Sequence, residues 1–195
     1  MTEKQRIRTQ GKKARRAMRP EERSEASVRI ARRIGDSVEF RCAETILIYN
    51  AVPDEVDLGF LTGLPEAEGK KFCYPHVLGE GKMEILQPSG PGDWKEGQYG
   101  IMEPDEKTSL KVNAEELDLV LCPCTAFDEQ GGRMGMGGGY YDRYLPNCVN
   151  AVIAAAAFEA QKVSAVPSEE TDVPMDMVFT ESAVYRRRKP DADRI

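Results

Sequence analysis

The sequence is poor in several features that mark whole classes of protein. Its 195 residues contain no run of eighteen apolar residues, and its N-terminal segment lacks the apolar stretch of a signal peptide. It has a single histidine, His76, no G-x-S-x-G elbow, and no Gly-Lys-Ser/Thr after its glycine-rich segment. We therefore expect a cytoplasmic protein without a membrane contact. The sequence also argues against a histidine-based triad and against a Walker-type phosphate loop.

Cysteine is present but shows none of the paired C-x-x-C spacings that hold zinc or carry redox chemistry. The five cysteines are Cys42, Cys73, Cys122, Cys124 and Cys148. An odd number without paired spacing favours reduced thiols. Because Cys122-Pro-Cys124 ends an apolar run, we interpret these two as small core residues at the end of a strand.

Charge is distributed unevenly along the chain. Residues 1–33 hold twelve Lys or Arg against four Glu, whereas the net charge of the whole chain is −6. The acidic remainder would repel a nucleic acid, and no aromatic side chains interleave with the basic ones. We therefore expect no nucleic-acid partner. Most of these cations fit a solvated helix face, and some are available to a small anion such as a nucleotide phosphate.

Helix-like and strand-like segments alternate along the chain. Helices are expected at 4–18, from Pro20 onward, at 56–64 and at 158–163, and strands at 45–51, 71–77, 82–87, 117–122, 150–157 and 177–180. Residues 88–106, rich in Pro and Gly, are expected to form a long loop. The alternation predicts one compact α/β domain over residues 1–184, with a mixed, mostly parallel sheet flanked by helices. Residues 185–195 are expected to form a flexible basic tail.

The most informative segment is residues 131–142, which read GGRMGMGGGYYD. Six glycines between Gly131 and Gly139 exclude a strand or helix interior, because each glycine costs backbone entropy there. The residues from Tyr140 to Leu145 predict a helix. A glycine-rich loop that leads into a helix N-terminus suits a phosphate, and Arg133 adds positive charge. The competing interpretation is a tight strand-to-helix turn with two tyrosines in the core.

Four blocks of sequence, in order, carry a resemblance over nearly the whole chain. They are KQRIR with ARRAM and PEER behind it, IYNAVPDEVD, DLVLCPCTAFDEQGGRMGMGGGYYDRYL, and ETDVPMDMVFTE. With these blocks the chain resembles the 5-formyltetrahydrofolate cyclo-ligase family, also called methenyltetrahydrofolate synthetases. The resemblance implies a compact α/β enzyme that uses ATP and Mg²⁺ to convert 5-formyltetrahydrofolate into 5,10-methenyltetrahydrofolate, releasing ADP and phosphate.

The resemblance also implies roles for individual residues. Arg133 and Tyr140 are expected to be catalytic, and Asp142 and Asp172 to hold magnesium. The residues expected to bind ATP are Lys4, Gln5, Arg6, Ile7, Arg8, Arg133, Met134, Gly135, Met136, Gly137, Gly138, Gly139, Tyr140 and Tyr141. Those expected to bind the reduced formyl-folate are Asn50, Glu55, Met136, Gly137, Gly138, Gly139 and Tyr140. A monomer or weak oligomer is expected.

The chain departs from part of the family pattern, and other functions stay open. Some relatives have a basic residue where this chain has Met136 or Gly138, so one loop cation is missing. A sugar-phosphate isomerase or acyl-CoA transferase on a related fold is one alternative, although Tyr-Tyr-Asp after the loop argues against it. A folate- or nucleotide-binding protein without turnover is another. A nucleic-acid-binding module that uses the basic N-terminal arm is the third.

Overall fold

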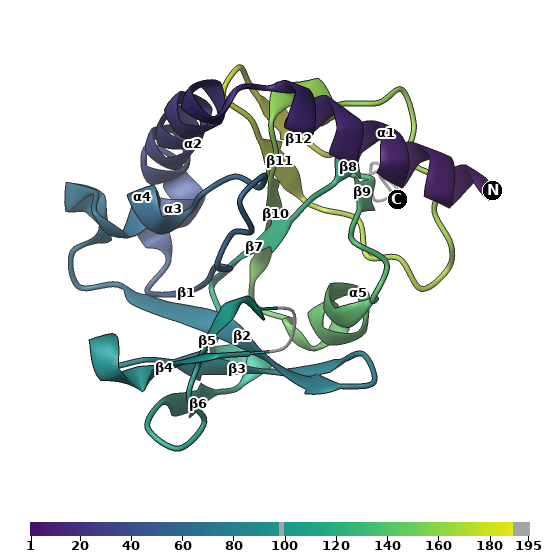
Figure 1. The fold of residues 1–195 in the computed structure, drawn as a ribbon. Coiled ribbons are helices and arrows are strands. Elements are labelled where there is room, and N and C mark those ends of the chain that lie inside the picture. The colour runs from purple at the N-terminus through teal and green to yellow at the C-terminus, as the bar shows by residue number, and fades with distance from the viewer. Residues whose placement is uncertain (98–99, 189–195) are drawn as a thin grey trace, which may run out of the picture.

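The structure is a computed structural model that describes residues 1–97 and 100–188, and Figure 1 shows its fold. The α-helices are α1 (Glu3–Ala17), α2 (Pro20–Gly35), α3 (Val38–Cys42), α4 (Gly59–Thr62) and α5 (Tyr140–Tyr144). Short 3₁₀ turns are η1 (Pro65–Ala67), η2 (Pro91–Asp93), η4 (Ala114–Glu116), η5 (Leu145–Asn147) and η6 (Glu159–Gln161). Within the described residues, none of the helices combines the length and apolar character that crossing a bilayer requires.

One mixed sheet organises the fold. Its strands, within the described residues, are β1 (Thr45–Leu47), β2 (Lys71–Gly79), β3 (Lys82–Gln87), β6 (Leu110–Val112), β7 (Leu119–Pro123), β10 (Val152–Ala156), β11 (Met177–Phe179) and β12 (Val184–Arg186). Their order is β12-β11-β10-β7-β1-β2-β3-β6. The five central strands from β11 to β2 pair in parallel, whereas β12, β3 and β6 pair antiparallel with their neighbours. The predicted α/β class with a mixed sheet is confirmed.

The two faces of the sheet build separate cores. Leu119 and Leu121 of β7 pack into the cluster that includes the apolar residues of α2, α3 and α4. Val120 and Cys122 point the other way, into the cluster that includes Leu145 and residues of α5. This alternation along one strand is the period of two that a strand buried on both faces requires. Figure 1 shows α2, α3 and α4 on one side of the sheet and α5 on the other.

A small hairpin leads into the glycine-rich loop. β8 (Ala126–Phe127) and β9 (Arg133–Met134) pair antiparallel and form a sheet of their own. Helix α1 packs on this hairpin through Ile7, which is buried against Ala126 and Met134. The start of the loop is therefore fixed between the main sheet and α1, which passes β8 and β9 in Figure 1.

Two predicted helices are much shorter than expected. In the segment 56–64, only α4 is helical, because the Asp57 carboxylate accepts the N–H of Gly59 at 2.8 Å and forms a turn instead. In the segment 158–163, only η6 forms. There the Gln161 side chain accepts the N–H of Phe158 at 2.8 Å, and the next residues join β8 rather than extending a helix.

The predicted loop at 88–106 contains regular structure. β4 (Trp94–Glu96) and β5 (Met102–Pro104) form an antiparallel hairpin, and residues 98–99 lie outside the described residues. Trp94 packs on Tyr74 of β2 with ring centroids 4.8 Å apart, so the hairpin is held to the main sheet by an edge-to-face aromatic pair.

The boundary expected at residue 185 falls within β12. Val184–Arg186 pairs with β11, so the first residues of the expected tail belong to the sheet. Arg186 also makes an ion pair with Glu39 of α3 at 2.6 Å. The part of the expected tail at 189–195 lies outside the described residues.

Candidate functional site

A cavity of about 1110 Å³ opens at the carboxyl ends of β1 and β7. Tyr49 and Asn50 follow β1 into it, and Pro123 and Cys124 bring the end of β7 to it. From β1 the sheet continues to β2 on one side, and from β7 it continues to β10 on the other. The cavity therefore lies where the strand order reverses, which is the usual place for ligands of open α/β sheets. Its volume suits more than one small ligand.

Most residues that the sequence assigned to the site line this cavity. They are Lys4, Arg8, Asn50, Glu55, Arg133, Met134, Gly135, Met136, Gly137, Gly138, Gly139, Tyr140, Tyr141, Asp142 and Asp172. Three other assigned residues, all of them described, have different surroundings. Gln5 caps the start of α1 with Thr2, Ile7 is buried on the β8–β9 hairpin, and Arg6 lies 3.9 Å from Glu3 on the solvent side.

The glycine-rich loop is tied down by two arginines from outside it. Nε of Arg8 donates to the carbonyl oxygen of Gly135 at 2.9 Å, and Arg143 donates to that of Gly138. Gly137 has a φ of 110°, a conformation that side chains rarely adopt. The loop has the uncharged Met136 where some relatives have a basic residue. Its positive charge comes instead from the guanidinium groups of Arg8 on α1 and Arg143 on α5.

The helix after the loop is short. Gly139 precedes α5 in the left-handed conformation, with a φ of 66°, and α5 itself has only five residues. A helix of this length has a weak macrodipole, so its N-terminus would contribute little to binding a phosphate. Anion binding here would depend on the loop N–H groups and on the arginines that flank them.

Arg133 and Asp142 form a pair across the loop. The side chain of Arg133 is only 2% exposed, and its Nη2 donates to Oδ1 of Asp142 at 2.8 Å. Its Nη1 reaches the carbonyl oxygen of Pro123 at 3.4 Å, and its guanidinium lies 5.7 Å from the ring centre of Tyr141. The charge is therefore held by the end of β7 and by α5, at one wall of the cavity.

Lys4 and Asp172 form a second pair at the same end of the cavity. Nζ of Lys4 lies 2.7 Å from Oδ2 of Asp172 and 3.1 Å from Glu169. Burial raises the pKa of the Asp172 carboxyl, but the hydrogen bonds from Lys4 and from the N–H of Glu169, together with the charge of Lys4, outweigh it, so the pKa lies below its ordinary value. The pair joins the first turn of α1 to the segment before β11.

Glu55 lies at the other end of the cavity, deep among apolar and phenolic side chains. Its side chain is 8% exposed, and Oε1 accepts Nη1 of Arg15 at 3.2 Å. Burial raises the pKa of the Glu55 carboxyl above its ordinary value, and the charge of Arg15 opposes this rise. The hydroxyl groups of Tyr49 and Tyr141 are also buried here, and neither has a hydrogen-bond partner among the described residues.

The remaining wall at this end is mostly apolar. Tyr74, Val77 and Met83 contribute from the β2–β3 hairpin, and Met102 contributes from β5. Asn50 donates to the carbonyl oxygen of Met102 at 2.7 Å, which joins the end of β1 to the β4–β5 hairpin. This end of the cavity therefore combines an apolar wall with a buried carboxylate.

The β4–β5 hairpin is also fastened by a buried carboxylate. Glu103 is 4% exposed and accepts the N–H of Val77 at 3.0 Å and a contact from Nδ1 of His76 at 2.9 Å. The only histidine of the chain thus takes part in holding one wall of the cavity.

Sequence reasoning missed several residues of the site. Arg15 stands in a basic run that resembles a solvated helix face, yet it is 1% exposed. Tyr49, Thr125 and Arg143 line the cavity; they lie inside the second and third sequence blocks, but nothing in the blocks marked them as site residues. One signal was available for Arg15: residues 4, 8, 11 and 15 share one face of a helix, and the first two had already been assigned to the site.

The carboxylates at the end of the cavity that holds Lys4 and Arg133 suit magnesium only together with oxygens from a bound ligand. Within the part of the chain that the structure describes, no group of three or more His, Cys, Asp or Glu could hold a metal. Asp142 and Asp172 both line the cavity, and each already pairs with a cation. Magnesium usually binds one or two carboxylates and fills its other positions with water and substrate phosphates. These oxygens fit that mode and do not form an all-protein cage.

Comparison with known proteins gives a consistent result. Residues 1–181 match the model of the 5-formyltetrahydrofolate cyclo-ligase family. The 5-formyltetrahydrofolate cyclo-ligase of Haemophilus influenzae is 30% identical over 176 residues, which are 88% of this chain and 94% of that protein. The Escherichia coli K12 enzyme of the same name is 30% identical over 175 residues, or 88% and 96% of the two chains.

Two solved structures share the fold. The 5,10-methenyltetrahydrofolate synthetase of Aquifex aeolicus aligns with a TM-score of 0.85 and 30% identity, covering 100% of this chain and 97% of that one. The synthetase of Mycoplasma pneumoniae aligns with a TM-score of 0.75, covering 92% and 99%, and at 21% identity it supports the fold alone.

Proposed function

Because the chain belongs to the 5-formyltetrahydrofolate cyclo-ligase family, we propose that it uses ATP and Mg²⁺ to cyclise 5-formyltetrahydrofolate to 5,10-methenyltetrahydrofolate. The products besides the folate are ADP and phosphate. The observation that carries the proposal is that one cavity has paired cations and carboxylates at one end and a buried carboxylate with an apolar wall at the other.

The chemistry requires activation of a poor electrophile. The nitrogen of an N-formyl group donates its lone pair into the carbonyl, which lowers its reactivity. Transfer of the γ-phosphoryl group to the formyl oxygen makes that oxygen part of a good leaving group. The neighbouring folate nitrogen then attacks the formyl carbon and gives up its proton, the C–O bond to phosphate breaks, and the ring closes. Positioning and charge neutralisation supply most of the acceleration of such a transfer.

At the nucleotide end, the cations neutralise the phosphates. Arg8 and Arg133 flank the glycine-rich loop, and Lys4 lies across from it on α1. Asp142 and Asp172 would hold the magnesium ion, which would supply positive charge to the nucleotide phosphates. The loop from Met134 to Tyr141 would donate its N–H groups to the phosphates. Lys4 and Arg8 come from the start of α1, and the residues between them, Gln5, Arg6 and Ile7, form the helical turn that positions both cations.

At the folate end, Glu55 would accept hydrogen bonds from the amino-pyrimidinone edge of the pterin. Asn50, beside the β4–β5 hairpin, would bind the same ring system. Tyr140 stands between the two ends, next to the loop residues from Met136 to Gly139, and would pack against the ring near the formyl group. Arg133 and Tyr140 are the residues that we propose to act on the reacting atoms.

The proposal is tested by mixing the purified protein with 5-formyltetrahydrofolate, ATP and magnesium and following the near-ultraviolet absorbance of the methenyl product. Growth of this band only when all three are present supports the proposal. A flat trace with folate binding seen by calorimetry would instead identify a binding protein without turnover, and a flat trace without binding would refute both.

A further inference from the structure

Arg15 is almost completely buried, although its side chain carries a positive charge. It lies in the last turn of α1, a helix whose other cations are mostly exposed or half-buried, yet only 1% of its surface is accessible. Removing a guanidinium from water is costly, and a buried ion pair often adds nothing to stability over apolar residues of the same size. The position of Arg15 therefore calls for a functional reason.

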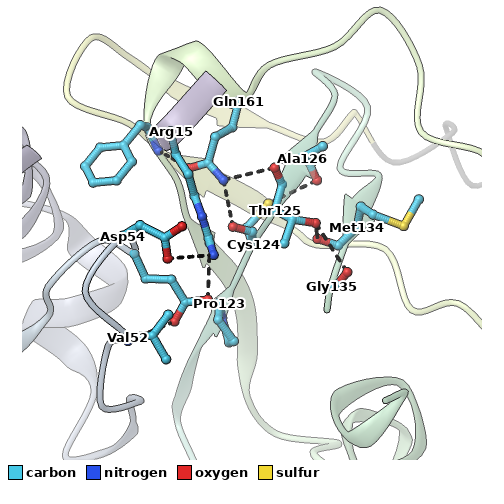
Figure 2. Close-up of polar contacts among 12 residues, drawn as sticks. Arg15, Val52, Asp54, Pro123, Cys124, Thr125, Ala126, Met134, Gly135 and Gln161 are labelled. Carbon is cyan, nitrogen blue, oxygen red and sulfur yellow. Dashed lines mark hydrogen bonds and ion pairs between the residues drawn. The ribbon is translucent and has the colours of Figure 1, made fainter. Parts of the chain in front are cut away.

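The guanidinium of Arg15 bridges two neighbouring carboxylates. Nη1 lies 3.2 Å from Oε1 of Glu55, and Nη2 lies 3.1 Å from Oδ1 of Asp54. Figure 2 shows Arg15 reaching toward Asp54 beside the turn that contains Val52. Asp54 has a second cation, since its Oδ2 accepts Nε of the exposed Arg16 at 2.8 Å. Glu55 also accepts a long hydrogen bond, from the N–H of Val52 to its Oε2 at 3.4 Å.

The surroundings of Glu55, apart from Arg15, disfavour its negative charge. The titratable groups that face it are Asp54 beside it, Tyr49 after β1, Tyr141 on α5 and Arg15 on α1. Burial raises the pKa of Glu55, the negative charge of Asp54 adds to the rise, and Arg15 opposes both. A protonated Glu55 would lose the acceptor capacity that an amino-pyrimidinone edge needs.

The path of α1 is adapted to bring Arg15 to this place. Lys4, Arg8, Gly11 and Arg15 follow one another on one face of the helix, and each approaches a different part of the cavity wall. At Gly11 the helix passes so close to Thr125 that a β-carbon would overlap its carbonyl oxygen. This close approach sets the distance from which Arg15 reaches the Glu55 turn.

We propose that Arg15 is a positioning residue for folate binding, which holds the Glu55 carboxylate ionised and in place at the folate end of the cavity. The inference rests on the proposed function, because it assigns Glu55 to the folate. Arg15 acts through Glu55 and does not touch the reacting atoms.

The test compares R15M with R16M in the steady-state cyclisation assay. Arg16 is the next residue of the same helix, its side chain is 68% exposed, and it forms an ion pair with Asp54, so it controls for the loss of a cation at this turn. We expect R15M to raise the folate KM about tenfold or more while the ATP KM stays within about twofold, as for loss of one charge-assisted contact. R16M is expected to leave both within about twofold. R15K, which restores the charge, is expected to recover part of the folate KM.

Two further measurements separate positioning from a merely structural role. Folate affinity of R15M should fall as the pH is lowered, and the fall should begin at a higher pH than in the wild type. In the double-mutant cycle with E55Q, R15M should add little to the folate KM, because the group through which Arg15 acts is already uncharged. In the double variant R15M/E55Q, position 55 is an uncharged amide, so no buried carboxylate is left there without a cation. The double variant therefore remains informative if R15M alone fails to fold.

The results that overturn the inference are equally distinct. Arg15 would be a merely structural residue if R15M raised the folate and ATP KM equally. The same conclusion would follow if its loss of folate affinity did not depend on pH, or if its effect added fully to that of E55Q. An inactive wild type would refute the proposed function instead. In that case the same variants are compared by calorimetry with 5-formyltetrahydrofolate alone, and a wild type that does not bind it overturns the inference as well.

Discussion

Replacing Gly11 with alanine tests whether the position of α1 controls the site. A β-carbon at this residue would overlap the carbonyl oxygen of Thr125 and lie 2.8 Å from its carbonyl carbon and 3.2 Å from Cβ of Ala126. The obstacle cannot simply rotate away, because it is backbone. Its oxygen also accepts Nε2 of Gln161 at 3.0 Å, a contact drawn in Figure 2.

The magnitude follows from the overlap. Carbon atoms pack best at about 3.5–4.0 Å, so α1 must retreat from β8 by roughly 1 Å. Alanine favours a helix over glycine by up to about 1 kcal/mol, but overpacking of this kind costs about 1–3 kcal/mol. We therefore expect a net loss of up to about 2 kcal/mol. For a chain of this size, each kcal/mol lowers Tm by about 2–4 °C.

The same retreat would carry Arg8 away from the glycine-rich loop and Arg15 away from Glu55. A misplacement of about 1 Å at a site of this kind costs roughly 10² in rate. The assays are calorimetric melting and kcat/KM for cyclisation, with Q10A as the control, since Gln10 is its exposed neighbour in the same helix. Q10A should stay within about 0.5 kcal/mol of the wild type. A G11A variant with wild-type Tm and wild-type kcat/KM would refute the argument that α1 is held at its closest approach.

Other substitutions test the nucleotide end. We expect R133M and D142N each to lower kcat by about 10² or more, the loss typical of one well-placed electrostatic group, with unchanged far-ultraviolet circular dichroism; near-normal kcat in both would contradict the roles proposed for them. We expect K4M to raise the ATP KM and leave the folate KM within about twofold. Burial alone would raise the pKa of Asp172, but in the folded protein its interactions, including the hydrogen bond from Lys4, keep the pKa below its ordinary value. The pair therefore stabilises the fold above about pH 4, and this contribution is lost as the pH falls further. The stability deficit of K4M should accordingly shrink in urea titrations below that pH, and a constant deficit would contradict the pairing.

The sequence predicted the parts of the fold that depend on local pattern. The strand at β7 and the hairpin of β2 and β3 have the expected apolar runs and alternation, and they form close to the predicted residues. The helices at 56–64 and 158–163 fail because side chains within them bond to nearby backbone, as Asp57 and Gln161 do. Propensity alone does not register this competition.

For the site, the sequence brought together residues from distant segments, but it missed what holds them. Lys4 and Arg8 could be assigned because they are four residues apart and match a known motif. Gly11 is a poor helix former inside the predicted helix 4–18, and Arg15 resembled a solvated cation. Their meaning depends on Thr125 and Glu55 approaching that helix. These contacts join residues forty or more positions apart in the chain, so no local pattern reveals them.

The measurement that tests the central claim most directly follows the formyl oxygen itself. 5-Formyltetrahydrofolate labelled with ¹⁸O in the formyl group is converted with ATP and magnesium, and the released phosphate is analysed by mass spectrometry. If the γ-phosphoryl group is transferred to the formyl oxygen, each phosphate released with a methenyl product carries one ¹⁸O atom. Unlabelled phosphate would mean that ATP is cleaved by water and that the cavity does not perform the proposed transfer.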